Sequence, residues 1–146
     1  MDFPSSVTLV QETFKNWSGE LQQDDAWTCQ PATEEEVVLV AHWAARAGYA
    51  LRVRGYAHNW SPLVISKESI HAGAGSEKIL LMDLRVHWQG MQMTGATPPA
   101  VTVECGAAME DLLDFLEGAG CGVTSCPAPG DITVGGALAI DGHGTG

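Results

Sequence analysis

Residues 52–62 gather the chain's most chemically varied side chains into one short turn. The segment reads Arg-Val-Arg-Gly-Tyr-Ala-His-Asn-Trp-Ser-Pro, so an imidazole, an amide and a hydroxyl closely follow two guanidinium groups. A turn of this kind can direct several backbone N–H groups and His58 at one ligand, which is how proteins hold phosphate groups. We therefore predict that this turn binds a phosphate-bearing cofactor.

A second glycine-rich stretch, residues 129–138, lies near the end of the chain. Gly135 and Gly136 lack a Cβ, which allows the main chain to approach a ligand closely. A helix beginning at 134 would add a partial positive charge of about half a unit at its N-terminus. Two such loops indicate one cofactor held between two strand–helix turns. The alternative for the second loop is a tight turn that binds nothing.

The acidic character of the chain restricts its partners. Its 146 residues include 18 acidic and 7 basic side chains, for a formal net charge of −11. This charge repels nucleic acid and anionic lipid, so neither is predicted as a partner.

The sequence contains no run of about 18 apolar residues, so no membrane span is predicted. The first residues do not form a signal peptide, which leaves open a secreted protein whose leader was removed. The oligomeric state is unknown.

A capped helix precedes the His58 turn. Thr33 and Glu36 have the spacing of a capping box, apolar residues follow at helical spacing, and Gly48 suits a left-handed stop. We predict a helix at 34–47.

Strands are predicted on both sides of the His58 turn, at 51–54 and at 79–82, where Asp83 ends an apolar run. The order of elements predicts an α+β fold, with short strands packed against helices, rather than a regular Rossmann alternation. The remaining expectations are a short strand at 7–10 within an otherwise irregular segment 5–30, an extended segment at 62–65, an exposed loop at 66–77, strands at 86–93, 101–104 and 122–125, a turn at 94–99, and helices at 109–117 and 134–139.

The four cysteines show no CxxC spacing, so no metal site is predicted. Cys121 and Cys126 are close enough in sequence to form a disulfide, and buried free thiols are the favoured interpretation. The glycines at 142, 144 and 146 are typical of an internal loop. We therefore predict that the chain is the N-terminal piece of a longer polypeptide.

Four segments, in order, resemble the PCMH-type FAD-binding domain of the vanillyl-alcohol oxidase superfamily. They are a helix leading into Arg-Gly-x-x-His at 54–58, an apolar strand with Asp-Leu at 79–84, Val-x-x-Gly-Ala at 103–107, and Thr-Val-Gly-Gly at 133–136 followed by the glycines of 142–146. The resemblance implies an N-terminal lead-in at 1–33 and the first part of an FAD-binding domain at 34–146. Residues 58–62 and 14–21 look most similar to the bacterial type II cholesterol oxidases, which carry covalent FAD.

The resemblance implies that the intact protein is a secreted, FAD-dependent oxidase of a sterol 3β-alcohol. Such an enzyme transfers hydride from the alcohol to flavin, which leaves a ketone, and then reduces O2 to H2O2. In this family the residues that act on the alcohol lie further along the polypeptide, so no catalytic residue is nominated and this chain alone is predicted to have no turnover. The alternatives are a sugar-lactone or alditol oxidase of the same superfamily, and a non-catalytic nucleotide-binding module.

The resemblance also implies roles for single residues. His58 would bond to the 8α-methyl group of the flavin, since a neutral imidazole nitrogen is nucleophilic; the alternative is a histidine that caps its turn. Arg54 could instead pair with a surface carboxylate. Tyr56 and Ala57 stand where many relatives have other residues, and their side chains are expected to limit how closely the backbone approaches phosphate. The implied FAD-binding residues are Arg54, Gly55, Tyr56, Ala57, His58, Asn59 and Ser61 in the first loop, Gly130, Ile132, Thr133, Val134, Gly135 and Gly136 in the second, and Gly142 and Gly144 after it.

Overall fold

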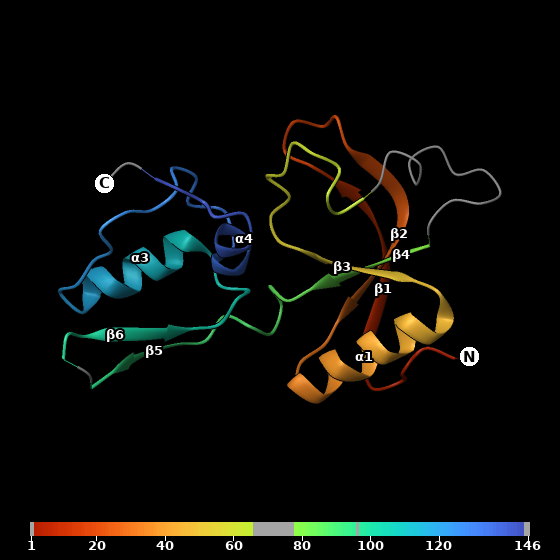
Figure 1. The fold of residues 1–146 in the computed structure, drawn as a ribbon, viewed down its shortest axis with the longest axis horizontal. Coiled ribbons are helices and arrows are strands. Elements are labelled where there is room, and N and C mark those ends of the chain that lie inside the picture. The colour runs from red at the N-terminus through yellow and green to blue at the C-terminus, as the bar shows by residue number, and fades with distance from the viewer. Residues whose placement is uncertain (1, 66–77, 96, 145–146) are drawn as a thin grey trace. The chain divides into compact units, whose positions relative to one another are not determined.

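The computed structural model describes residues 2–65, 78–95 and 97–144, which belong to two compact units, 1–87 and 88–146 (Figure 1). The exposed loop predicted at 66–77 lies outside the described residues. The predicted boundary at residue 33 stays a prediction. Helices and short strands alternate irregularly along both units, so the predicted α+β class is confirmed.

The first unit is built on one four-stranded sheet in the order β1-β2-β4-β3. β1 (Thr8–Lys15) and β2 (Gln22–Gln30) form an antiparallel hairpin, and β3 (Ala50–Arg54) and β2 both run parallel to β4 (Ile79–Asp83). The strand expected at 7–10 is present as the first part of β1, but the expectation that the rest of 5–30 is irregular was wrong. Gln22 and Gln23 at the start of β2 have low strand propensity, but they pair with Lys15 and Phe14 of β1; the register shifts at Asp24 and Asp25, which follow them.

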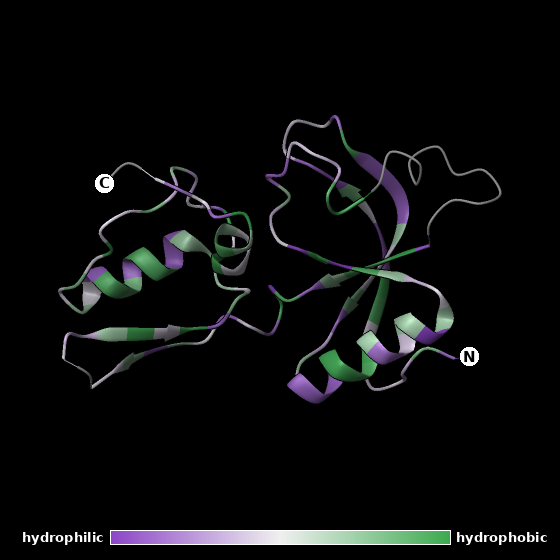
Figure 2. Ribbon diagram, viewed as in Figure 1, coloured by the Kyte–Doolittle hydropathy of each residue, from purple (hydrophilic) through white to green (hydrophobic). Residues whose placement is uncertain are grey.

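Helix α1 (Glu34–Ala47) has the predicted bounds. The Thr33 hydroxyl accepts from the Glu36 N–H at 3.2 Å, whereas the Glu36 carboxylate accepts from the N–H of Ala32 rather than of Thr33. The helix ends at Gly48, which has a left-handed φ of 74°. Figure 2 shows the hydrophilic first turn and the hydrophobic middle of α1. The acidic first turn complements the positive end of the helix dipole.

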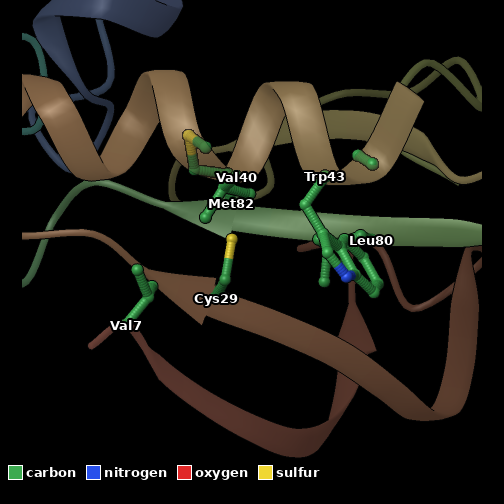
Figure 3. Close-up of a cluster of buried hydrophobic side chains, with 7 residues drawn as sticks. Val7, Cys29, Val40, Trp43, Leu80 and Met82 are labelled. Atoms are coloured by element: carbon green, nitrogen blue, oxygen red, sulfur yellow. The ribbon is translucent and has the colours of Figure 1, made fainter. Parts of the chain in front are cut away.

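Strand β4 is buried along its whole length, which explains its continuous apolar sequence. Leu80 and Met82 face α1, where they pack with Val40 and Trp43 of the helix and with Cys29 of β2 (Figure 3). Alternate residues of β4 face the opposite side of the sheet. The cluster on that side consists of Phe14, Leu21, Ala26, Ala57, Ile65, Ile79 and Leu81. The turn after β3 therefore covers this second face.

The second unit contains the antiparallel pair β5 (Met91–Thr94) and β6 (Ala100–Val103), with α3 (Met109–Gly118) and α4 (Val134–Ala139). Its core consists of Ala107, Met109, Leu112, Leu116, Val134 and Ala137. The strand predicted at 86–93 begins only at Met91, because residues 85–87 form a turn. The strand predicted at 122–125 is wrong, since that segment pairs with no strand in the described part of the chain.

Candidate cofactor-binding site

The His58 turn is anchored to the first unit by its neighbour Ala57. Ala57 is 8% exposed and packs in the cluster with Phe14 and Leu81. Its φ of 61° lies in the left-handed region, which is unfavourable by about 1 kcal/mol for a residue with a Cβ. The methyl group is turned into the core, so it does not stand between the backbone and a ligand. The steric limit expected at Ala57 is therefore absent.

Hydrogen bonds from the loop between β1 and β2 hold two carbonyl groups of the turn, one before His58 and one after it. The Trp17 N–H donates to the Ala57 carbonyl, and the side-chain amide of Asn16 donates to the Asn59 carbonyl, each at 3.0 Å. In a trans peptide the N–H points opposite to the carbonyl. The N–H groups of His58 and Trp60 consequently point away from this loop.

Arg54, at the end of β3, forms an ion pair that leaves one of its donors unused. Its Nη1 donates to Glu12 of β1 at 2.8 Å, and its guanidinium lies 5.4 Å from the centre of the Phe14 ring. Burial lowers the pKa of Arg54. Its Nε is buried and has no hydrogen-bond partner among the described residues. The predicted alternative of a carboxylate partner is thus present, and a buried donor remains beside the turn.

A second charged pair fixes the end of β4. The Arg85 guanidinium donates to both carboxylate oxygens of Asp83 and lies 4.9 Å from the centre of the Tyr56 ring. Burial alone would raise the pKa of Asp83, but the hydrogen bonds from Arg85 outweigh it and lower that pKa. The Tyr56 side chain, 38% exposed, is therefore held against Arg85.

The N-terminus of α4 uses its own N–H groups within the second unit. Val134 donates to the Ala107 carbonyl and Gly135 to the Cys105 carbonyl, both at 2.9 Å. The Gly136 N–H donates to the hydroxyl of Thr133, the N-cap residue, at 3.0 Å. Each of these three N–H groups therefore already has an acceptor within the second unit.

The glycines of the second loop are required by the protein's own packing. A Cβ added at Gly135 would lie 2.8 Å from the Cys105 carbonyl oxygen, and one added at Gly136 would lie 2.8 Å from the Thr133 hydroxyl. Gly130 packs similarly against Glu110, and its carbonyl accepts from the Glu110 N–H. The remaining predicted glycines are also closely packed. A Cβ added at Gly142 would meet Ala137, and one added at Gly144 would meet Cys126.

The structure brings each predicted group of residues together within its own unit. Arg54, Gly55, Tyr56, Ala57, His58, Asn59 and Ser61 form one turn in the first unit, and Gly130, Ile132, Thr133, Val134, Gly135 and Gly136 form one loop in the second. That the two loops share one cofactor stays a prediction. Sequence reasoning missed the contacts of Asn16 and Trp17 with the turn, although it singled out residues 14–21.

The cysteines differ from the expected buried free thiols. All four cysteines are free, and only Cys29 is buried. Burial raises the pKa of Cys29 to about 12. No cluster of three or more metal-ligating side chains occurs among the residues that the structure describes. None of the helices in residues 2–65, 78–95 and 97–144 is long and apolar enough to cross a membrane.

The fold and the His58 turn define a dinucleotide-binding domain, and comparison with known families gives its type. The chain belongs to the FAD binding domain family, which matches residues 26–146. The resemblance to a PCMH-type FAD-binding domain is therefore confirmed. No protein with a curated description matches the chain.

Three solved structures of cholesterol oxidases are similar to the chain. A solvent-stable cholesterol oxidase is 44% identical over 99% of this chain, with a TM-score of 0.87. The cholesterol oxidase of Brevibacterium sterolicum is 38% identical over 98%, with a TM-score of 0.88. A histidine-to-alanine variant from the same organism is 37% identical over 98%, with a TM-score of 0.87. The chain covers 26% of each of these proteins, so it spans about a quarter of their length.

The residues around His58 fit an FAD. The imidazole is half-buried, and the Arg54 Nε beside the turn is a buried donor without a partner among the described residues. A dinucleotide with a pyrophosphate and a flat ring system can use donors and a nucleophilic nitrogen of this kind. The second loop fits less directly, because the N–H groups of Val134, Gly135 and Gly136 are already bonded.

Proposed function

We propose that the intact protein is an FAD-dependent oxidase of a sterol 3β-alcohol and that this chain supplies part of its FAD cradle. The observation that carries the proposal is the 44% identity to a cholesterol oxidase over 99% of the chain. The family match to an FAD binding domain and the two further cholesterol oxidase structures support it.

The proposed reaction is balanced by two substrates. Oxidation of the alcohol to a ketone releases two electrons and two protons, and reduction of O2 to H2O2 takes up the same number. Bound FAD supplies the redox chemistry that connects the two half-reactions. The part played by this chain is to bind and orient the cofactor through the His58 turn. The groups that act on the alcohol are proposed to lie in the other three quarters of the protein.

His58 is proposed to bind the flavin covalently. A ring nitrogen of the neutral imidazole forms a bond to the 8α carbon, one C–H bond of that methyl group and the N–H bond of the ring break, and both protons leave to solvent. The step would be balanced by O2, which would take up two electrons and two protons and leave as H2O2. Three features support this role: the imidazole is half-buried, the Ala57 and Asn59 carbonyls before and after it are hydrogen-bonded, and the chain belongs to an FAD-binding family.

The test uses the intact protein and two histidine variants. We expect the mass of the denatured wild-type protein to exceed the polypeptide mass by that of FAD, and we expect this increment to vanish in His58→Ala. His42→Ala is the matched control, because His42 is exposed on α1, and it should keep the increment. Retention of FAD by denatured His58→Ala would refute the linkage.

A substrate comparison tests the activity itself. The intact wild-type protein should form H2O2 when supplied with cholesterol in detergent, and it should form none with an alditol or a sugar lactone. Peroxide from the alditol or the lactone alone would overturn the sterol assignment and leave the FAD-binding assignment intact. The present chain, supplied with FAD, is expected to form no peroxide from cholesterol.

A further inference from the structure

The loop that joins β1 to β2, residues 16–21, is a rigid support and not a loose connection. The Asn16 N–H donates to the Leu21 carbonyl at 2.9 Å, and the Leu21 N–H donates back to the Asn16 side-chain oxygen at 3.0 Å. The Gly19 N–H closes a tighter turn onto the Asn16 carbonyl at 3.0 Å. Asn16 is 2% exposed, and Leu21 is buried in the sheet core. We call residues 16–21 the hairpin tip.

The hairpin tip holds one carbonyl before His58 and one after it. The backbone of Trp17 donates to the Ala57 carbonyl, in the peptide that precedes His58, and the side chain of Asn16 donates to the Asn59 carbonyl, one peptide further along the chain. These two bonds hold the chain before and after His58, which restricts the backbone that carries its Cβ. This support also maintains the left-handed conformation of Ala57.

The ring of His58 has its own aromatic neighbour on the hairpin tip. The Trp17 indole lies nearly parallel to the imidazole, with an interplanar angle of 17° and ring centres 6.3 Å apart. Trp60 packs edge-on against the same indole, with ring centres 4.8 Å apart. His58, Trp17 and Trp60 therefore form a row of three aromatic rings. Both tryptophans are more than half exposed, but the Trp17 ring beside the imidazole limits its rotation.

We propose that the hairpin tip positions His58 for its bond to the flavin, with Asn16 fixing the backbone and Trp17 fixing the ring. This inference rests on the proposed linkage through His58. A nucleophilic nitrogen must lie close to the 8α carbon and point along the new bond, and small losses of orientation slow such a reaction strongly. Asn16 and Trp17 are positioning residues, since they act through His58 and the turn that carries it.

The experiment measures how fast the covalent bond forms in the intact protein. Wild type, Trp17→Ala, Trp17→Phe, Asn16→Asp and Trp27→Ala are produced in a flavin-depleted host and mixed with FAD. Acid-stable flavin is followed with time, and total bound flavin and the melting temperature are measured on the same samples. Trp27→Ala is the matched control, because Trp27 is also exposed and lies in the same hairpin, on β2.

We expect bond formation to slow about fivefold to tenfold in Trp17→Ala, with total bound flavin and melting temperature close to those of the control. Trp17→Phe keeps an aromatic ring and should recover most of the rate. Asn16→Asp keeps the acceptor for Leu21 but removes the donors to Asn59 and Ser18, and should also slow the reaction.

The outcomes separate this inference from the one on which it rests. Acid-stable flavin that forms in Trp17→Ala and Asn16→Asp at the wild-type rate overturns the positioning role and leaves the linkage through His58 standing. A proportional loss of total flavin and melting temperature, without recovery in Trp17→Phe, also overturns it, because only general support of the fold would then be present. Wild type without any acid-stable flavin overturns both proposals.

Discussion

Replacing Gly135 with alanine tests whether the paired glycines of the second loop serve the fold or the cofactor. The added Cβ would lie 2.8 Å from the Cys105 carbonyl oxygen and 2.9 Å from the Cys105 Cβ, closer than real Cβ atoms approach. The start of α4 must therefore move away from Cys105. This movement lengthens the 2.9 Å hydrogen bond that the Gly135 N–H donates to the same carbonyl.

The expected loss of stability follows from three contributions. Overpacking of a close contact destabilises by about 1–3 kcal/mol, and weakening the hydrogen bond adds about 0.5–1.5 kcal/mol. Restricting the unfolded chain by Gly→Ala offsets about 0.4–1 kcal/mol. We therefore expect Gly135→Ala to lower the free energy of unfolding by about 2 kcal/mol, even when no flavin is bound.

Urea unfolding of the flavin-free protein measures this loss. Gly118→Ala is the control, because Gly118 is also a helical glycine and a Cβ added there would meet nothing within 4 Å. The control should change stability by no more than about 0.5 kcal/mol, or raise it slightly. A Gly135→Ala protein that unfolds like wild type but binds FAD more weakly would refute the packing argument and restore the cofactor interpretation of this glycine.

Three further predictions concern the first unit. Glu12→Gln removes the charge that faces the part-buried guanidinium of Arg54 and should lower stability by about 1 kcal/mol in urea unfolding; an unchanged midpoint would show that the pair contributes nothing. Hydrogen bonds lower the pKa of Asp83 in the folded state, so its contribution to stability is complete above about pH 4 and is lost as pH falls through the folded pKa. Asp83→Asn should flatten that acid dependence in urea titrations, and an equally steep dependence would contradict the assignment. Burial raises the pKa of Cys29 to about 12, so a maleimide at about pH 8 should label exposed Cys105 quickly and Cys29 only in denaturant; mass spectrometry showing rapid labelling of native Cys29 would contradict this.

Elements with local signals were predictable from the sequence, and elements that depend on distant partners were not. Helix α1 was predicted with its bounds, because Thr33 and Gly48 mark its ends within the segment itself. Strand β2 was missed, because Asp24 and Asp25 interrupt its pattern. They form an irregularity in the pairing with β1, which continues on both sides of them, at 22–23 and 26–30. The strand expected at 122–125 does not form. Its local pattern suits a strand, but it has no partner strand among the described residues.

In the candidate site, too, features with a local signal were predictable and contacts between distant residues were not. The His58 turn was recognisable because its chemically varied residues are adjacent in sequence, whereas Asn16 acts on Asn59 from 43 positions away. The paired glycines were recognised as a feature, but the reason offered for them was incomplete. A glycine that admits a ligand and a glycine that admits the carbonyl of Cys105 look identical in sequence, and only coordinates distinguish them.

The hairpin that supports the His58 turn begins before the segment that the family match covers. The family match begins at residue 26, within β2, so β1 and the hairpin tip precede it. Yet Phe14 of β1 is fully buried in the same cluster that contains Ala57, and the hairpin tip bonds to the carbonyls of Ala57 and Asn59. The conformation of the His58 turn therefore depends on residues that lie outside the matched segment, so a protein shortened to residues 26–146 would lose this support.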